Sequence, residues 1–478
     1  MASGLSVEQP LRRDSTRARS ICRHSENRSH SRPETSRSAH HISAPVSEVP
    51  SLAHIYTAHR ITRQTTTYRV LPQLRLHTTM DSYRLTATQV AAQIRAGHLT
   101  VEAYARSLLA RIQERDPVVK AWAHLDVEYV LAQAKLLDAI PPEQRGPLHG
   151  VSVAVKDVIY TRDMPTRFNS PIYDGESRTP DAASVAILRH AGALLLGKTT
   201  TTEFAATTAG PQTCNPHTSS PSAPRTPGGS SSGSGAVVGD FQAAIALGTQ
   251  TGGSTIRPGS FNGVYAFKPT WNSVTREGQK IYSLMLDTLG LYARSVEDLE
   301  LLADCFHLED DEPVGRGFSV KGARFAFCKT VLWPHVGPGT AAAMEKARHL
   351  LEAHGAVVEE IELPRSLDGL PAWHAAIMKS DGRTAFLPEY VVARDQLSDE
   401  LSGHVENRTR LSRAAQLEAF DNIAAARPVV DKILKGYDAV VTPSVPDEAP
   451  EGTQSTGSAA FNLIWTVSTT PLVRGIIS

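Results

Sequence analysis

The sequence predicts an α/β fold with a largely parallel, buried β-sheet, and three observations support this prediction. Short apolar runs rich in β-branched residues alternate with segments of helical periodicity, which is typical of strands joined by helices. The 478 residues, 41% of them hydrophobic and 21% charged, suit a soluble globular protein with a large core. No internal repeat or linker divides residues 85–478, so one large domain is expected there.

Three helices are predicted at the start of the ordered part of the chain. The first begins with a capping box at Thr86 and ends at Gly97. The second follows directly and is expected to end at Pro117, because proline disrupts the interior of a helix. The third is predicted over residues 127–139.

Strands and helices then alternate along the rest of the chain. The predicted strands cover residues 150–160, 193–197, 243–248, 323–328, 356–363 and 437–444. The predicted helices cover residues 184–192, with Ser184 as the cap, 296–306 and 340–355. Because a helix separates most consecutive strands, a mainly parallel sheet is expected.

The first 79 residues differ from the rest of the chain. They contain twelve Arg, no Lys and five acidic residues, and they have almost no apolar periodicity. Such a segment cannot bury enough apolar surface to fold alone, so residues 1–79 are predicted to form a disordered extension. Two alternatives stay open: a non-native stretch that precedes a true start at Met80, or a mitochondrial transit peptide.

Composition excludes several classes of protein. The formal net charge is zero and the body of the chain has no basic stripe, so no nucleic-acid partner is expected. The four cysteines form no CxxC pair and no HExxH motif occurs, so neither a disulfide scaffold nor a metal site is predicted. No apolar run reaches 18 residues, which predicts no membrane span. A reducing compartment, the cytoplasm, is expected.

Two motifs match patterns that their surroundings contradict. GALLLGKT at 192–199 fits the P-loop pattern, but its four intervening residues are those of a buried strand and not of a phosphate-binding loop. GSSSG at 229–233 fits the nucleophile elbow of α/β-hydrolases, which would make Ser231 the nucleophile. The residues before it, SSPSAPRTPG, cannot form the strand that the elbow needs. We therefore reject both interpretations.

Three other segments carry residues that are suited to catalysis. GVSVAVKD at 150–157 places Lys156 at the end of an apolar strand, either reaching solvent or desolvated as a base. TPGGSSSGSG at 226–235 has the composition of a linker or of a strained loop. GTQTGGSTIRP at 248–258 is either an ordinary glycine turn or a cluster of backbone N–H groups around Ser254 that could bind an oxyanion.

Taken together and in this order, these segments resemble the amidase signature hydrolases over roughly residues 85–470. The 24-residue separation of Ser230 and Ser254 agrees with that family. The resemblance implies a single large domain over residues 80–478, with a mixed, largely parallel central sheet that is covered by helices on both faces. It also implies a Ser–Ser–Lys triad in which Ser254 is the nucleophile, Ser230 the bridging serine and Lys156 the base.

The resemblance implies further features of the site. The bridging serine is expected to follow a cis peptide bond, here Gly229–Ser230, and the adjacent serines to hold the loop by hydrogen bonds. The N–H groups of Thr251, Gly252, Gly253 and Ser254 are expected to form the oxyanion hole and, with Ser230, to contact the substrate. Arg257 is expected to brace the nucleophile loop. Asn262 and Ala266 depart from the family at positions expected to serve packing.

The implied activity is hydrolysis of a non-peptide carboxamide to a carboxylate plus ammonia or an amine, with no cofactor and no metal. The partner is then a small-molecule amide, in a cytoplasmic protein that could form a homodimer. Two alternatives are kept: an amidotransferase A-type subunit that generates ammonia from glutamine, and a truncated, inactive homologue. The second arises because the chain ends in RGIIS, where the family is expected to continue.

Overall fold

A computed structural model describes residues 79–175, 179–218, 222–309, 318–468 and 472–474, which belong to one compact unit. Apart from Thr79, the predicted disordered extension lies outside the described residues. Met80 is part of a short 3-10 helix, Thr79–Arg84. Further 3-10 helices are Pro142–Gln144, Pro171–Tyr173, Glu203–Ala205, Trp333–His335, Arg365–Leu367 and Arg394–Gln396.

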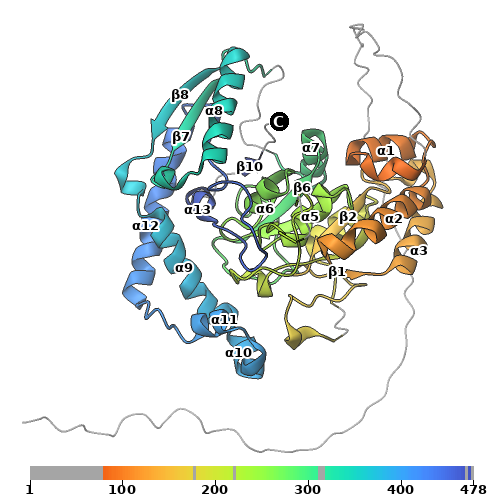
Figure 1. The fold of residues 1–478 in the computed structure, drawn as a ribbon, viewed down its shortest axis with the longest axis horizontal. Coiled ribbons are helices and arrows are strands. Elements are labelled where there is room, and N and C mark those ends of the chain that lie inside the picture. The colour runs from red at the N-terminus through yellow and green to blue at the C-terminus, as the bar shows by residue number, and fades with distance from the viewer. Residues whose placement is uncertain (1–78, 176–178, 219–221, 310–317, 469–471, 475–478) are drawn as a thin grey trace, which may run out of the picture. The chain divides into compact units, whose positions relative to one another are not determined.

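A seven-stranded sheet forms the centre of the fold (Figure 1). Its strands are β1 (Trp122–Leu125), β2 (Ser152–Lys156), β3 (Leu194–Thr199), β4 (Ile245–Gln250), β5 (Tyr265–Lys268), β6 (Thr288–Ala293) and β10 (Leu472–Arg474). Their spatial order is β1-β3-β2-β4-β6-β5-β10. Strands β2, β3, β4 and β6 are buried along their whole length; the continuous apolar runs predicted this for β2, β3 and β4, whereas β6 was not predicted.

The central sheet is mixed, as expected, but it is less parallel than the sequence predicted. Strand β2 pairs in parallel with β3 and β4, whereas the other four pairings of the described strands are antiparallel. The difference arises after β4, where β5 and β6 lie next to each other and only a loop joins them. A loop allows the chain to reverse direction, so β6 runs antiparallel to both of its neighbours.

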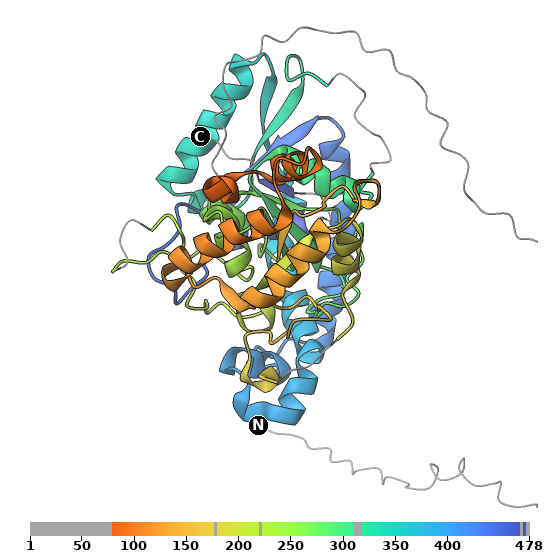
Figure 2. The same ribbon diagram turned by 90° about the vertical axis from the view of Figure 1, so that its right-hand side faces the viewer.

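Helices flank the central sheet (Figures 1 and 2). They are α1 (Ala87–Arg95), α2 (Val101–Val119), α3 (Val127–Asp138), α4 (Ala183–His190), α5 (Ser232–Gly239), α6 (Ile256–Phe261) and α7 (Val296–Cys305). Pro117 does not end α2, because proline is compatible with helical φ and its missing N–H costs one bond in the last turn. Ser184 is not a cap either, since α4 begins one residue earlier, at Ala183.

A second sheet contains three parallel strands in the order β8-β7-β9. They are β7 (Arg324–Lys329), β8 (Val357–Glu362) and β9 (Ala439–Val441), close to their predicted positions. The accompanying helices are α8 (Pro338–Ala353), α9 (Leu370–Ala385), α10 (Leu387–Ala393), α11 (Asp399–Val405), α12 (Arg413–Leu434) and α13 (Ala460–Val467). The sequence analysis predicted α8 among these helices and not the other five.

Two large clusters of buried apolar residues stabilise these layers. The first lies around the central sheet, where α5 contacts β2, β3, β4 and β6. The second lies among α9, α12 and α13 and includes Ile377, Ile423 and Trp465. None of the helices in the described ranges combines the length and the apolar character that a membrane crossing requires.

Candidate active site

Lys156 lies at the carboxyl end of β2, between β3 and β4 in the central sheet. Its side chain is fully buried, so the interpretation in which it reaches solvent is wrong. Its Nζ lies 2.7 Å from Ser230 Oγ and 2.8 Å from Thr249 Oγ1. Burial lowers the pKa of Lys156 well below its ordinary value, an effect that Asp287 opposes and Arg257 reinforces. A buried amine of this kind can accept a proton.

The serine-rich stretch is a buried loop that leads into α5, so the linker interpretation is wrong. The peptide bond between Gly229 and Ser230 is cis, as the resemblance implied. Close packing requires the glycines: Gly228 has a φ of +81°, and a Cβ on Gly229 would lie 2.4 Å from Thr456 Cγ2. The next serines bond to backbone groups, Ser231 Oγ to the N–H and C=O of Thr249, Ser232 Oγ to Gly228 and Ser234 Oγ to Leu247.

The turn formed by residues 251–254 follows β4, and its carbonyl groups are all occupied. The Thr251 carbonyl accepts a bond from His374 Nε2 at 2.9 Å, and the Gly252 carbonyl accepts one from Thr466 Oγ1 at 2.6 Å. The Gly253 carbonyl accepts from the backbone N–H of Arg257 at 3.0 Å. Within the described residues, none of the four N–H groups of this turn donates a hydrogen bond. The turn therefore has donors available for a ligand, as an oxyanion hole requires.

The turn and the serine-rich loop meet through their backbones. The N–H of Ser231 donates to the carbonyl of Ser254 at 3.3 Å. Tyr292 Oη donates to the same carbonyl at 3.3 Å. The two predicted reactive hydroxyls are not joined, because Ser254 Oγ forms no hydrogen bond to any residue in the described ranges. Ser230 is buried, whereas Ser254 is half-buried.

Arg257 holds the serine-rich loop rather than only its own turn. Its Nε and Nη2 donate to the carbonyl of Gly229 at 3.1 and 2.5 Å, and its Nη1 donates to the carbonyl of Gly457. Burial lowers the pKa of this guanidinium to about 10, so it stays protonated at neutral pH. The bracing role predicted for Arg257 thus extends to the residue that precedes Ser230.

Three residues of the site were not predicted. Thr249 supplies the second contact of Lys156. Gln250 Oε1 accepts bonds from the backbone N–H groups at residues 255 and 256, at 2.9 and 3.1 Å, and so fixes the start of α6. Asp287 accepts a bond from Thr251 Oγ1 at 2.6 Å, and burial raises its pKa to about 6. The signal available in the sequence was a polar residue inside or next to an apolar strand.

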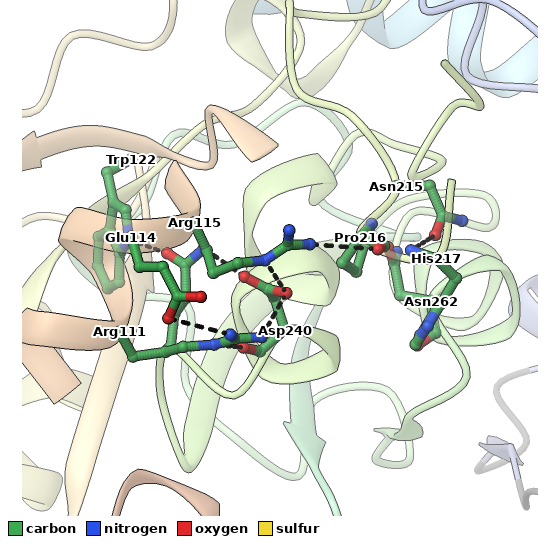
Figure 3. A network of polar contacts seen from close by, with 10 residues as sticks. Arg111, Glu114, Arg115, Trp122, Asn215, Pro216, His217, Asp240 and Asn262 are labelled. Carbon is green, nitrogen blue, oxygen red and sulfur yellow. Dashed lines mark hydrogen bonds and ion pairs between the residues drawn. The ribbon is translucent and has the colours of Figure 1, made fainter. Parts of the chain in front are cut away.

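A polar network holds the carboxyl ends of α5 and α6, the helices that follow Ser230 and Ser254 in the chain (Figure 3). Asp240 caps the carboxyl end of α5 and accepts bonds from Arg111 at 3.0 Å and from Arg115 at 3.1 Å. Asn262 caps the carboxyl end of α6, and its Nδ2 donates to the carbonyl of Pro227 at 2.7 Å. Asn262 therefore ties α6 to the start of the serine-rich loop, which is more than the packing role predicted for it.

Ala266 has the packing role that the sequence predicted. Its side chain is fully buried on β5. A Cβ on Gly259 would lie 2.4 Å from the Ala266 Cβ, so β5 and α6 approach each other closely at this point. A larger side chain at either position would push the helix away from the sheet.

The rejected motifs have structural roles. The P-loop match forms the buried strand β3, where Lys198 Nζ contacts Asp157 at 3.1 Å and Thr166 Oγ1 at 2.6 Å. Ser231 uses its hydroxyl to bind the backbone of Thr249, so it lacks the free hydroxyl of a nucleophile. Among the described residues, no three His, Cys, Asp or Glu side chains lie close enough together to hold a metal ion.

A cavity of about 450 Å³ lies near the site but not on it. None of the three predicted triad residues lines it; its walls include Asn169, Glu203, Asp395 and Glu400. The wall connects to the serine-rich loop through Thr202, whose N–H donates to the carbonyl of Ser230 at 3.3 Å.

The chain is similar in sequence to a family model and to two proteins of known name. A family model described as Amidase matches residues 103–474. The A-type subunit of glutamyl-tRNA(Gln) amidotransferase from Symbiobacterium thermophilum is 37% identical over 306 residues, which cover 61% of this chain and 63% of that relative. The protein of the same name from Lysinibacillus sphaericus is 30% identical over 406 residues, 77% of this chain and 83% of the relative. The chain thus spans less than two thirds of the first of these relatives.

Solved structures show the same fold. A structure described as an amidase has a TM-score of 0.70 and 27% identity, and the match covers 81% of this chain and 91% of the other. The native peptide amidase from Stenotrophomonas maltophilia has a TM-score of 0.63 and 27% identity, with 82% and 90% of the two chains covered. A fatty acid amide hydrolase with a TM-score of 0.71 is 20% identical and supports the fold alone.

Proposed function

This chain belongs to the amidase family, whose members act as hydrolases on amides, and we propose that it cleaves a small, non-peptide carboxamide through an acyl-enzyme on Ser254. The observation that carries the proposal is the 2.7 Å contact between the buried Lys156 Nζ and Ser230 Oγ. A serine hydroxyl is a weak nucleophile and needs a base. A neutral lysine beside a second serine supplies one.

In the proposed acylation step, Ser254 Oγ attacks the carbonyl carbon of the amide. Its proton passes to Ser230 while the proton of Ser230 passes to Lys156. The N–H groups of Thr251, Gly252, Gly253 and Ser254 stabilise the oxyanion that forms. Ser230 then donates its proton to the departing nitrogen and recovers one from Lys156, which is neutral again; this donation is needed because an amide anion is a poor leaving group.

In the proposed deacylation step, water attacks the ester on Ser254. Lys156 accepts the proton of this water through Ser230, and it returns a proton through Ser230 to Ser254 Oγ when the bond between Ser254 and the acyl group breaks. The balance is one amide and one water consumed, with one carboxylate and one ammonium or protonated amine produced. This cycle requires only groups of this chain and water.

Labelling by a fluorophosphonate probe tests the proposed nucleophile. Wild-type protein should be labelled at one residue, and Ser254→Ala should abolish labelling. Ser260→Ala is the matched control, because Ser260 lies in α6 and its hydroxyl bonds, among the described residues, only to Ile256 and Ser444. Folded wild-type protein that resists the probe would contradict the proposal and favour the inactive homologue.

The curated relatives favour a second candidate, the amidotransferase A-type subunit that the sequence analysis kept as an alternative. Both of the relatives compared by sequence carry the name of that subunit, so we propose glutamine as the competing substrate. Both candidates use the same acylation step and differ in the amide and in the partners.

A substrate panel separates the two candidates. The purified chain should release ammonia from simple aliphatic, aromatic or fatty amides if it acts alone. Release from glutamine only, and only with added partner proteins, would support the amidotransferase candidate. Sedimentation of the purified chain tests the proposed homodimer in the same preparation, because a monomer and a dimer differ twofold in mass.

A further inference from the structure

His374 is a buried histidine that the proposed mechanism does not use. It lies in α9, in the part of the chain where the sequence analysis predicted no site residue, and it is 3% exposed. Its Nε2 lies 2.9 Å from the carbonyl oxygen of Thr251. The Cε1 atom lies 3.4 Å from the position that a Cβ on Gly252 would occupy, so the ring packs against the 251–254 turn.

The chemistry of this contact determines which nitrogen carries the proton. A carbonyl oxygen only accepts hydrogen bonds, so Nε2 must be the protonated nitrogen. Burial lowers the pKa of His374 to about 4, and the ring is therefore neutral at physiological pH. A neutral ring with a proton on Nε2 donates to the carbonyl of Thr251 without placing a buried cation beside the turn.

The geometry of a trans peptide connects this contact to the proposed oxyanion hole. In a trans peptide, the C=O of one residue and the N–H of the next point in opposite directions. The only cis bond among the described residues is Gly229–Ser230, so the peptide between Thr251 and Gly252 is trans. Fixing the Thr251 carbonyl toward α9 therefore fixes the Gly252 N–H away from α9.

The same relation holds for the next two peptides of the turn. Thr466 Oγ1 binds the carbonyl of Gly252, which fixes the N–H of Gly253. The Arg257 N–H binds the carbonyl of Gly253, which fixes the N–H of Ser254. Each of these three donors thus has its orientation set by a bond to the carbonyl of the same peptide.

From this arrangement we propose that His374 is a positioning residue, which holds the Thr251–Gly252 peptide so that the Gly252 N–H points at the oxyanion. The proposal rests on the proposed function of the 251–254 turn. A misplaced donor weakens the interaction with the oxyanion and leaves the interaction with the neutral amide nearly unchanged, so His374 should affect kcat more than KM.

The test compares two side-chain amides that differ by one methylene. In His374→Gln, the side-chain NH2 reaches about as far as Nε2 and can donate to Thr251. In His374→Asn, the NH2 falls short of that position. His374→Asn should lower kcat and the rate of fluorophosphonate labelling about 10- to 100-fold, with KM changed less than threefold, and His374→Gln should recover most of the loss.

The control is His149→Asn, which makes the same substitution at another buried histidine, located before β2 and away from the turn. It should retain wild-type labelling. Equal rates in wild type and His374→Asn would overturn the proposal, and so would a His374→Gln variant as slow as His374→Asn. If His374→Asn does not fold, Thr466→Val tests whether a bond to a turn carbonyl positions the N–H of the same peptide, here Gly252–Gly253. A Thr466→Val variant that is labelled at the wild-type rate would overturn the proposal. Absence of labelling in wild type would instead refute the proposed function.

Discussion

Among single residues, the buried lysines of the described structure differ in what surrounds them. Lys156 contacts two hydroxyl groups, and Lys198 pairs with Asp157. Lys268 Nζ donates, within the described residues, only to the carbonyl of Pro269, at 2.8 Å, and burial lowers the pKa of Lys268 to about 7. The same substitution, by methionine, at Lys156 and at Lys268 therefore distinguishes the loss of a catalytic base from the free-energy cost of burying an amine.

Replacing Lys156 by methionine should lower kcat by about 10³-fold or more, because the hydroxyls of Ser230 and Ser254 lose their base. The desolvation cost of the amine disappears, which offsets the two lost hydrogen bonds, so the variant should remain folded. Lys268→Met is the control and should retain wild-type kcat. Amide hydrolysis at saturating substrate and circular dichroism measure both effects. An active Lys156→Met variant would exclude this lysine as the base.

Lys268→Met should also raise the free energy of unfolding at pH 7, by about 1–3 kcal/mol. The folded-state pKa of about 7 lies below the ordinary value of 10.5, so between these values the unfolded chain binds more protons. The wild type therefore loses stability as the pH falls from 10.5 toward 7. The difference in unfolding free energy between Lys268→Met and the wild type should become smaller as the pH rises toward 10.5. Urea titrations at pH 7 and pH 10 test this, and a constant difference would contradict it.

At the scale of elements, strands were easier to predict than helices. Buried strands appear as short β-branched runs, and β2, β3, β4, β7, β8 and β9 lie close to the predicted runs, whereas β1, β5, β6 and β10 were not predicted. Strand direction was not predictable, because alternation of apolar runs does not record whether the chain reverses between β5 and β6. Helix α5, with the sequence SGSGAVVG, has no apolar face to detect because every residue is buried. Its glycines allow close approach: a Cβ on Gly233 would lie 2.3 Å from the Ala121 carbonyl oxygen.

The site was predictable only from its segments together. Lys156, Ser230 and Ser254 lie in stretches that alone resemble a strand end, a linker and a turn, and only their order and spacing led to their prediction as a site. The structure brings Lys156 and Ser230 into contact, and the catalytic roles of the three residues stay a prediction. His374 was not predictable, because its role depends on which backbone group the fold brings opposite it. A lone histidine in a helix gives no sign of the carbonyl it will contact.

Replacing Gly253 by alanine should lower kcat by about 10- to 100-fold. The added Cβ would lie 2.9 Å from both Asn462 Nδ2 and Ala459 Cβ, so the turn between β4 and α6 must shift. Gly436→Ala is the matched control after α12, where the nearest atom lies 3.6 Å away, and it should retain wild-type kcat. Steady-state kinetics of the two variants on one amide measure this effect. Equal kcat values for Gly253→Ala and Gly436→Ala would contradict the prediction and show that the turn tolerates the shift.

For the whole molecule, the site lies where elements of the two apolar clusters meet. Strand β2 of the central sheet supplies Lys156, and the loops before α5 and α6 supply Ser230 and Ser254. Helices α9 and α13, which pack on each other in the second cluster, supply His374 and Thr466 to the 251–254 turn. Figure 1 shows both helices on the side of the sheet that carries α6. The positions of the turn carbonyls therefore depend on the packing of the second cluster.

This dependence predicts that a cavity in the second cluster lowers activity as well as stability. Ile377 is fully buried in α9, three residues after His374, and Ile377→Ala should cost about 2–5 kcal/mol of unfolding free energy. The helix gains freedom next to the cavity, so the bond from His374 to Thr251 weakens and kcat falls severalfold. Ile112→Ala removes the same atoms from α2 in the first cluster and should cost similar stability with wild-type kcat. Both variants are assayed at a temperature where circular dichroism shows each fully folded. An equal kcat in the two variants would mean that the turn is held independently of the second cluster.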